Sequence, residues 1–434
     1  MIIQKMFLSI LVMVIASAWL VTGCSTSETR SPTDSGNENQ SPPMPPYDLK
    51  AIAISPTEIK LTWRDQSQNE SGFEIFESVN NDTSYMLVET VGQNVEIIVL
   101  TGRSRDNDYY YKIRAVNEFG ASSFSNETEV TGGALILEID AGEGAVLGVA
   151  YSPQGNYIIA GCSDYRVRRY NAYTGDLLQT LEVHSGHVNA VAYSPDSLRF
   201  ASASDDGTIK VWHTWDQHIE WIFQEEGMGV DEVEFSPDGR YLASGGINVC
   251  IWDIEDGGLV NKFGYDDDTG GITSFAYHPN GRYMFCAARA GIELWNLDGP
   301  DTAIVHQRTA QAKSLKISAD GRYMCGAYGS TVRLWEIVGE GDSMRLDSLT
   351  TLAEEEQGGH TDAVFAVDFS PDGMFIASGS RDNTAKVWDA FGYTLLGTLY
   401  EHDPAVYCLD FSPDGTHLAT GGGDTKIKIW STFF

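Results

Sequence analysis

Residues 359–388 read GHTDAVFAVDFSPDGMFIASGSRDNTAKVW, and a unit of this kind decides the fold of most of the chain. The unit has a four-residue turn, Ser370-Pro371-Asp372-Gly373, then an alternating strand and a second strand that ends in Trp388. The turn is specific because proline presets φ, aspartate bonds nearby backbone and glycine takes the left-handed position. A sheet made of one such unit cannot bury both of its faces, so it must stack on neighbours.

The unit recurs seven times in the last three hundred residues. Its turns are Ser152–Gly155, Ser194–Ser197, Ser236–Gly239, His278–Gly281, Ser318–Gly321, Ser370–Gly373 and Ser412–Gly415. The aromatic residues that end the second strands are Tyr170, Trp212, Trp252, Trp295, Trp335, Trp388 and Trp430. These aromatic residues are 40 to 43 positions apart, except for a spacing of 53 before Trp388. A repeat of this length indicates blades stacked around an axis.

In turn, strand pattern and period, the unit resembles the WD40 repeat. The resemblance covers residues 133–434 and implies a seven-bladed β-propeller. After Trp430 only four residues remain, too few for a fourth strand in the last blade. We therefore predict that residues near 134–140 supply that strand, pair beside residues 425–431 and close the ring.

The WD40 resemblance also implies a buried hydrogen-bond network of His, Ser or Thr, Asp and Trp in each regular blade. Carried over by position, the members are His187, Ser202, Asp206 and Trp212 in blade 2, His360, Ser378, Asp382 and Trp388 in blade 6, and His402, Thr420, Asp424 and Trp430 in blade 7. Blades 3, 4 and 5 carry Gly246, Arg289 and Gly329 where the aspartate is expected, and blade 1 ends in Tyr170. We expect these degenerate blades either to be less rigid or to have a face adapted to another purpose, and sequence drift explains them as well. Residues 265–271 and 338–357 are predicted to be unusual loops, of which the longer is a candidate functional segment.

The first residues are typical of an export signal. Lys5 precedes an apolar run of sixteen residues, Met6 to Val21, which is too short for a membrane span. It ends in Val21-Thr22-Gly23-Cys24, which resembles a bacterial lipoprotein cleavage site, so we expect cleavage between Gly23 and Cys24 and acylation of Cys24. Residues 1–23 are then the signal peptide. The mature protein is expected to be exported and lipid-anchored in the cell envelope, at the outer membrane if the source is Gram-negative.

Residues 24–46 are rich in Ser, Pro, Asn and Thr and are predicted to form a disordered tether that carries the lipid. Residues 47–132 alternate in short runs that predict an antiparallel β-sandwich. This segment resembles a fibronectin type III domain at Leu61-Thr62-Trp63, at Gly72-Phe73-Glu74-Ile75 and at residues 109–117. The resemblance implies that Trp63 is the core aromatic residue and that the Tyr109 hydroxyl bonds back to the backbone. The predicted fold class is all-β, with this sandwich followed by the propeller.

The sequence offers little for catalysis, so we predict no enzyme, no cofactor and no metal. No P-loop, zinc-protease motif, Cys-x-x-Cys pair or nucleophile elbow occurs. His184-Ser185-Gly186-His187 has a metal-like spacing, but His187 is already assigned to the blade network. Asp266-Asp267-Asp268 is better interpreted as a solvated acidic loop than as a calcium site. Five cysteines lie one per blade, and we expect buried free thiols.

The chain is strongly acidic, with 28 Lys and Arg against 61 Asp and Glu and a net charge of −33. Residues 133–434 alone hold 44 acidic and 19 basic residues, so most of the excess lies in the propeller. This charge argues against binding nucleic acid and favours either a basic partner or adaptation to salt. In many WD40 proteins the partner face carries the turn before the network aspartate, which here holds Ser163, Asp205 and Arg381.

The sequence predicts a monomeric, non-enzymatic, membrane-anchored scaffold whose propeller binds a protein partner. Two alternatives remain open. The propeller could bind or act on a small molecule or glycan at its central mouth, or the protein could be an envelope assembly factor by analogy of fold.

Overall fold

The computed structural model describes residues 41–55, 58–80, 84–103, 107, 109–131, 135–182, 184–216, 218–225, 229–246, 248–264, 271–288, 291–298, 304–307, 311–352, 359–400 and 402–432. The predicted signal peptide and the predicted lipid attachment at Cys24 lie outside the described residues. So does the acidic stretch Asp266-Asp267-Asp268. Within the described ranges, no helix has the length and apolar character needed to cross a membrane.

The N-terminal β region holds eight strands. They are β1 (Tyr47–Ser55), β2 (Glu58–Arg64), β3 (Gly72–Val79), β4 (Met86–Gly92), β5 (Ile97–Thr101), β6 (Tyr109–Asn117), β7 (Gly120–Ala121) and β8 (Thr128–Thr131). Their hydrogen-bonded order is β4-β3-β6-β8-β1-β2-β5, with β7 beside β6. The prediction of a sandwich implied two separate sheets, but β8 joins them. Thr128 and Glu129 pair antiparallel with β6, while Val130 and Thr131 pair parallel with β1.

Alternation along these strands builds one apolar core. In β6 the residues at alternating positions Tyr109, Tyr111 and Ile113 are buried, and their neighbours are half-buried. Trp63 is 2% exposed and packs edge-on against Phe73, with 5.6 Å between ring centroids. Trp63 is therefore a core residue of this region, as the sequence predicted.

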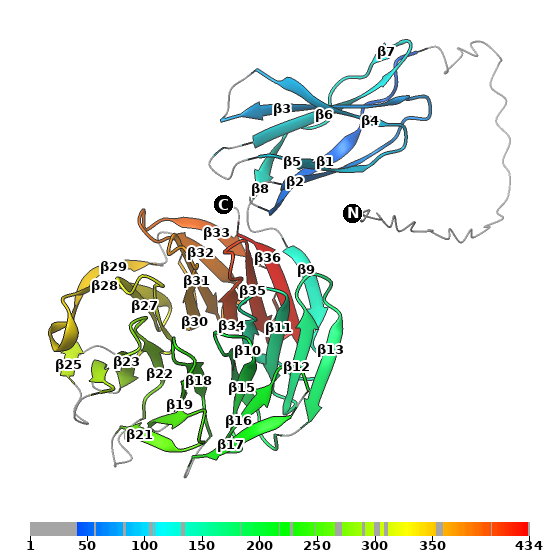
Figure 1. The fold of residues 1–434 in the computed structure, drawn as a ribbon. Coiled ribbons are helices and arrows are strands. Elements are labelled where there is room, and N and C mark those ends of the chain that lie inside the picture. Colours follow the sequence, from blue (N-terminus) through cyan, green and yellow to red (C-terminus); the bar gives the residue numbers. More distant parts are fainter. Residues whose placement is uncertain are drawn as a thin grey trace, which may run out of the picture. The chain divides into compact units, whose positions relative to one another are not determined.

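The remaining chain forms seven four-stranded antiparallel sheets. Blade 1 is β10 (Val146–Tyr151), β11 (Tyr157–Cys162), β12 (Arg166–Asn171) and β13 (Leu177–Glu182); blade 2 is β14 (Val188–Tyr193), β15 (Arg199–Ser204), β16 (Thr208–His213) and β17 (Ile219–Gln224); blade 3 is β18 (Glu232–Phe235), β19 (Tyr241–Gly245), β20 (Val249–Asp253) and β21 (Leu259–Phe263). Figure 1 shows these sheets arranged around a ring, with the first strand of each nearest its centre.

The later blades repeat the same order. Blade 4 is β22 (Ser274–Tyr277), β23 (Tyr283–Ala288), β24 (Gly291–Asn296) and β25 (Ile304–Gln307); blade 5 is β26 (Leu315–Ile317), β27 (Tyr323–Tyr328), β28 (Thr331–Val338) and β29 (Arg345–Leu352); blade 6 is β30 (Val364–Phe369), β31 (Phe375–Ser380), β32 (Ala385–Asp389) and β33 (Leu395–Leu399); blade 7 is β34 (Val406–Phe411), β35 (His417–Gly422), β36 (Lys426–Ser431) and β9 (Leu135–Asp140). The predicted seven-bladed propeller is confirmed.

The ring is closed by a strand that precedes the first blade in the sequence. β9 pairs antiparallel with β36, with Asp140 opposite Lys426 and Leu135 opposite Trp430. Ile139 of β9 is 3% exposed and lies in a core cluster shared by blades 7 and 1. The first and last parts of the propeller are thereby held in one sheet.

The expected long loop at residues 338–357 is corrected by the structure. Its described part is a long hairpin, because β28 runs to Val338 and β29 follows a short 3₁₀ turn, η2 (Gly341–Ser343). Leu346 of β29 is buried in the core shared by blades 4 and 5, and Leu352 in the core shared by blades 5 and 6. The two lengthened strands therefore account for part of the spacing of 53 residues, and the rest falls at residues 353–358, outside the described part.

Candidate functional site

Blade 6 contains a buried chain of hydrogen bonds that ties its strands together. Trp388 Nε1 donates to Ser378 Oγ at 3.0 Å, and His360 Nε2 lies 2.8 Å from the same oxygen. His360 Nδ1 lies 2.9 Å from Asp382 Oδ2. Burial acts to raise the pKa of Asp382, but hydrogen bonds from His360 and Thr384 outweigh it and hold that pKa well below its usual range. The four predicted residues therefore meet in one network.

Blade 7 repeats this arrangement with threonine in place of serine. Trp430 Nε1 and His402 Nε2 each lie 2.8 Å from Thr420 Oγ1, and His402 Nδ1 lies 2.9 Å from Asp424 Oδ1. The ring nitrogens and the hydroxyl all have partners inside the blade. The two histidine side chains are almost completely buried, so these networks serve to hold the strands of each blade together.

Blade 2 has the same network, but the histidine predicted for it was wrong. His184, not His187, places Nε2 2.8 Å from Ser202 Oγ and Nδ1 3.0 Å from Asp206 Oδ2. The side chain of His187 is 48% exposed and stacks on Tyr165. The reason is spacing: in blades 6 and 7 the histidine precedes the hydroxyl residue by 18 positions, and His184 precedes Ser202 by the same number.

Two blades that depart from the pattern keep a polar network built from other residues. In blade 3, Trp252 Nε1 donates to Ser244 Oγ at 2.9 Å, and Ser244 bonds the carboxylate of Glu225, which stands in for histidine. In blade 1, the Arg168 guanidinium bonds Asp164, and a Cβ on Gly142 would lie 2.9 Å from Arg168 Nη2. The guanidinium thus fills the space that the histidine takes elsewhere.

Blade 4 carries Cys286 at the hydroxyl position of the network, whereas blade 5 has Gly326 at that position and Cys325 next to it. Cys286 and Cys325 are fully buried, and they are free, as are the other described cysteines. Burial raises the pKa of both thiols well above its usual value. Buried thiols of this kind are poor nucleophiles. In these blades Arg289 and Gly329 stand where the network aspartate is expected. A Cβ on Gly329 would meet nothing within 4 Å, and Arg289 lies outside the described residues.

The predicted partner-face residues lie at one end of the propeller. Ser163, Asp205 and Arg381 belong to the turns between the second and third strands, and antiparallel pairing puts all such turns at the same end. In blades 2 and 6, this residue points to solvent while the next one joins the buried network. Arg381 is paired with Asp362 at 2.6 Å, whereas Asp205 accepts from Asn189 Nδ2 at 2.7 Å. Ser163 is half-buried.

A cavity of about 340 Å³ lies beside Asp205 and extends from blade 2 to the segment that joins blades 4 and 5. Its lining includes Asp231, Gln311 and several glycines that leave the surface hollow. A Cβ on Gly229 would lie 2.8 Å from the Asp205 Cα, so the backbone approaches closely here. Burial raises the pKa of Asp231, and the nearby Asp205 raises it further. The cavity is therefore acidic, and sequence reasoning found only one of its two aspartates.

The inner strands place charged side chains toward the centre of the ring. Carboxylates of one blade accept hydrogen bonds from the inner strand of the next: Phe275 N donates to Glu232 at 2.9 Å, Phe411 N to Asp368 at 3.1 Å and Tyr151 N to Asp410 at 2.6 Å. The carboxylates are surrounded by protein but keep partial contact with water. They act as links between blades, a role that the sequence did not reveal.

One cation faces these carboxylates from blade 5. Burial lowers the pKa of Lys316, but the carboxylates of Glu234, Glu232, Asp368 and Asp410 outweigh it and raise that pKa above its usual value. Burial raises the pKa of Glu232 to about 7 and that of Asp368 to about 6. Among the described residues, no group of three or more His, Cys, Asp or Glu side chains is arranged to hold a metal ion.

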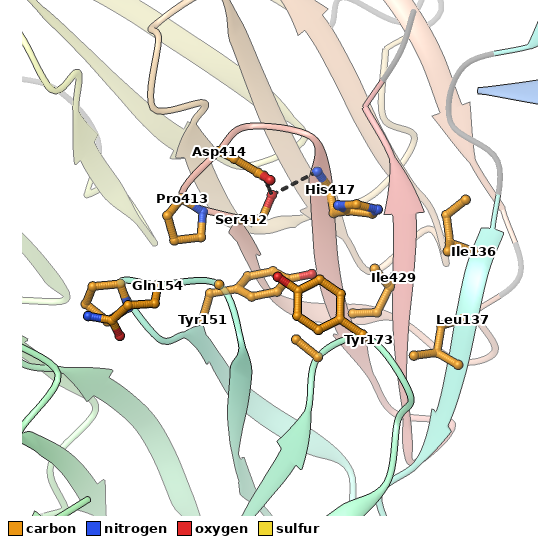
Figure 2. Close-up of a pocket in the computed structure, with 13 residues that line it drawn as sticks. Ile136, Leu137, Tyr151, Gln154, Tyr173, Ser412, Pro413, Asp414, His417 and Ile429 are labelled. Atoms are coloured by element: carbon orange, nitrogen blue, oxygen red, sulfur yellow. Dashed lines mark hydrogen bonds between the residues drawn. The ribbon is translucent and has the colours of Figure 1, made fainter. Parts of the chain in front are cut away.

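A second cavity, of about 330 Å³, opens where blades 7 and 1 meet, at the end opposite Asp205. Figure 2 shows Tyr151 and Tyr173 in the middle of its lining, with His417 and Asp414 contributed by blade 7. Apolar side chains, among them Leu137 of the closing strand, complete the wall. We call this cavity the seam pocket. Nothing in the sequence pointed to it, because its walls come from residues 136–173 and 412–429, which are far apart in the sequence.

Comparison with known proteins bears on the blades directly. The profile of the family described as WD domain, G-beta repeat matches residues 133–171, 175–213, 349–389 and 393–431. The chain carries WD40 repeats. Each matched segment begins with the outer strand of one blade and continues with the three inner strands of the next. The WD40 repeat is therefore offset from the blade by one strand, and this offset requires the closing strand β9.

Several curated proteins are similar to parts of this chain. An uncharacterised WD repeat-containing protein of Synechocystis is 30% identical over 135 residues, which cover 30% of this chain and 35% of that protein. Protein groucho of Drosophila melanogaster is 29% identical over 150 residues, covering 32% of this chain and 19% of groucho. Protein HIRA of Caenorhabditis elegans is 29% identical over 150 residues, covering 28% and 16%. The chain thus spans about a third or less of these relatives.

Proposed function

We propose that this protein is a non-enzymatic, membrane-anchored scaffold whose propeller binds a basic segment of a protein partner. WD40 propellers typically act as protein-interaction scaffolds, which supports the general role. The observation that carries the basic partner is the acidic cavity formed by Asp205 and Asp231. Asp205 has no part in the blade network. Its side chain is 47% exposed, accepts from Asn189 Nδ2 and lies 3.4 Å from His187 Nδ1, so a cationic ligand would reach this carboxylate from solvent.

Electrostatics supports this choice of partner. The propeller sequence carries 44 acidic and 19 basic residues, which favours encounter with cationic partners and repels nucleic acid. Lys and Arg side chains can donate charge-assisted hydrogen bonds to carboxylates that line a partly buried cavity. Because exposed charges are screened by salt, binding through this surface should weaken as ionic strength rises.

The double variant Asp205→Asn and Asp231→Asn tests this surface. With the full chain as bait in an extract of the source cells, we expect the variant to retain at least about tenfold less of a salt-eluted protein partner. The matched control is Glu255→Gln and Asp256→Asn, which changes the charge equally at the opposite end. An unchanged bound set in the first variant, or capture that resists salt, would contradict the proposal.

We further propose that the N-terminal segment anchors the protein. Cys24 follows an apolar run and a small-residue site, so acylation there would hold the chain at a membrane while residues 25–46 act as a tether. The β region at residues 47–131 would then be a fibronectin type III-like spacer, which its buried Trp63 and Phe73 support.

Labelling with radioactive palmitate tests the anchor. We expect the native chain to take up label and to sediment with membranes, and Cys24→Ser to lose both properties almost completely. Cys162→Ser, at a buried cysteine of blade 1, is the matched control and should keep the label. Label retained by Cys24→Ser would refute lipidation at this position.

A further inference from the structure

We propose that the seam pocket between blades 7 and 1 receives a lysine side chain from a basic segment of the protein partner. This inference rests on the proposed scaffold function and adds a second contact at the opposite end of the propeller. It is carried by the shape of the pocket, by the chemistry of its lining and by the charge on its rim.

The seam pocket forms where two side chains depart from the repeat. In five blades the turn between the first and second strands carries an aspartate that accepts a hydrogen bond from the turn serine at 2.6 Å, as Asp414 does from Ser412. Blade 1 has Gln154 at this position, and its exposed side chain is not used to close the turn. Blade 7 has His417 where most other blades carry an aromatic residue. With Tyr173, these residues meet around one cavity (Figure 2).

The pocket has an apolar wall and two aromatic rings. Leu137, Ile429 and Ala172 offer a surface for the methylene groups of a long side chain. Tyr151 is 7% exposed and anchored from behind by its backbone bond to Asp410, whereas Tyr173 is 69% exposed. The faces of tyrosine rings attract cations. An aliphatic stem that ends in an ammonium group matches both parts of this lining.

The rim of the pocket is negative. Burial acts to raise the pKa of Asp414, but hydrogen bonds from Ser412 and Thr416 outweigh it and keep that pKa low, so the carboxylate is ionised. Burial lowers the pKa of His417, and this imidazole is therefore neutral at pH 7. None of the lining residues is a lysine or an arginine. A cation entering the pocket would meet one carboxylate and no competing positive charge.

The hydrogen-bond chain on the rim orients the histidine as an acceptor. Thr416 Oγ1 lies 2.8 Å from Asp414 Oδ1 and 2.7 Å from His417 Nδ1. Because an ionised carboxylate can only accept, the Thr416 hydroxyl donates to Asp414, and its oxygen accepts a hydrogen bond from the Nδ1–H group of His417. The Nε2 atom of His417 then carries a lone pair that can accept a hydrogen bond from an ammonium group. Both polar groups of the rim thus favour a donor cation.

Peptide-observed NMR titration with the full chain tests the inference. The probe is acetyl-Gly-Gly-Lys-Gly-Gly-amide, compared with the same peptide carrying norleucine or glutamate and with free n-butylammonium. We expect the lysine peptide to bind at least about tenfold more tightly than the norleucine peptide, and the glutamate peptide not to bind. Equal binding of the norleucine peptide would overturn the inference, as would n-butylammonium binding as tightly as the lysine peptide.

Variants locate the binding at the seam pocket. Tyr173→Ala should weaken the lysine peptide about three- to tenfold, and Tyr173→Phe, which keeps the ring, should change affinity less than about twofold. Trp215→Ala is the matched control, because Trp215 is 67% exposed at the same turn position in blade 2. Native affinity in Tyr173→Ala would overturn the inference.

The two proposals can fail separately. Asp205 and Asp231 lie at the opposite end of the propeller, so their asparagine variants should leave the lysine peptide affinity unchanged. Partner capture that is lost in those variants but unaffected by Tyr173→Ala would remove the seam pocket from partner binding and leave the scaffold function standing.

Discussion

Deletion of residues 133–141 is expected to abolish the cooperative unfolding of the propeller. The deletion removes β9, whose five paired residues complete the last blade. It also removes buried Ile139 and leaves Lys428, which is 4% exposed, without Glu138 at 3.3 Å. Burial of each such apolar side chain contributes about 1.5–3 kcal/mol. Together, the loss of these buried side chains and of the hydrogen bonds between β9 and β36 approaches the entire free energy of unfolding of a domain, which is about 5–15 kcal/mol.

Calorimetry and urea unfolding measure this loss. A transition that keeps its midpoint and its steepness after the deletion would contradict closure by β9. Ile139→Asp is a milder variant and should lower stability by several kcal/mol while the chain still folds. Leu178→Asp is its control, since Leu178 is 49% exposed on the outer strand of blade 1 and should tolerate the charge.

A rearranged chain distinguishes loss of the strand from loss of an N-terminal segment. Residues 135–140 can be moved behind Thr432 and joined through the turn sequence of residues 171–176, which connects β12 and β13 in blade 1. Because β9 runs antiparallel to β36, a hairpin can deliver the same pairing. We expect this permuted chain to recover cooperative unfolding, and failure to recover would assign the effect of the deletion to something other than pairing.

The propeller could be predicted because its determinants are local. Turns such as Ser370–Gly373 join two strands that pair with each other, so the pairing is set by a few consecutive residues. Because each blade has one such turn, the number of turns gives the number of blades. The run Leu135–Asp140 before the first blade was the predicted closing strand, and it forms β9 beside β36. The sandwich expectation was less accurate, because β8 changes partners along its length. That change depends on pairing between segments about 80 residues apart, which no local pattern reports.

The candidate sites could be predicted only in part. His360 and His402 each stand alone before their hydroxyl partners, but blade 2 offers two histidines and only the 18-residue spacing selects His184. Arg168 can replace the missing histidine only because Gly142 has no side chain, since a Cβ there would lie 2.9 Å from Arg168 Nη2. The seam pocket joins residues from the first and the last parts of the propeller sequence. Such features arise from tertiary packing and leave no continuous pattern in the sequence.

Substitution of Lys316 is expected to destabilise the propeller in a pH-dependent way. Lys316→Met would leave four carboxylates, Glu232, Glu234, Asp368 and Asp410, without the cation that stabilises their ionised forms. Removal of one partner from a buried charge cluster costs about 3–5 kcal/mol, and water in the channel should reduce this to about 3 kcal/mol at pH 8. The free energy of unfolding from urea titrations measures the effect. Lys313→Met, at an exposed lysine of the same blade, is the control.

The sign of the pH dependence follows from the direction of the pKa shifts. The pKa is raised from 4.5 to about 7 for Glu232 and from 3.8 to about 6 for Asp368, so the folded state binds more protons than the unfolded state. The stability that these groups contribute is complete below about pH 4 and is lost as pH rises through about 6 to 7. Lys316→Met should therefore be least harmful near pH 5 and most harmful at pH 8.

The reciprocal change separates charge from packing. Glu232→Gln keeps an oxygen that can accept from Phe275 N, but it removes one of the carboxylates that repel each other. We expect it to raise the free energy of unfolding by about 1–2 kcal/mol at pH 8 and to restore part of the stability lost in Lys316→Met. If Lys316→Met instead costs the same at pH 5 and pH 8, its effect is loss of packing and the channel charges do not set the pH response. The asparagine variant of Asp368 gives an independent measurement, because its carboxylate links blade 6 to blade 7 through Phe411 N and should behave as Glu232 does.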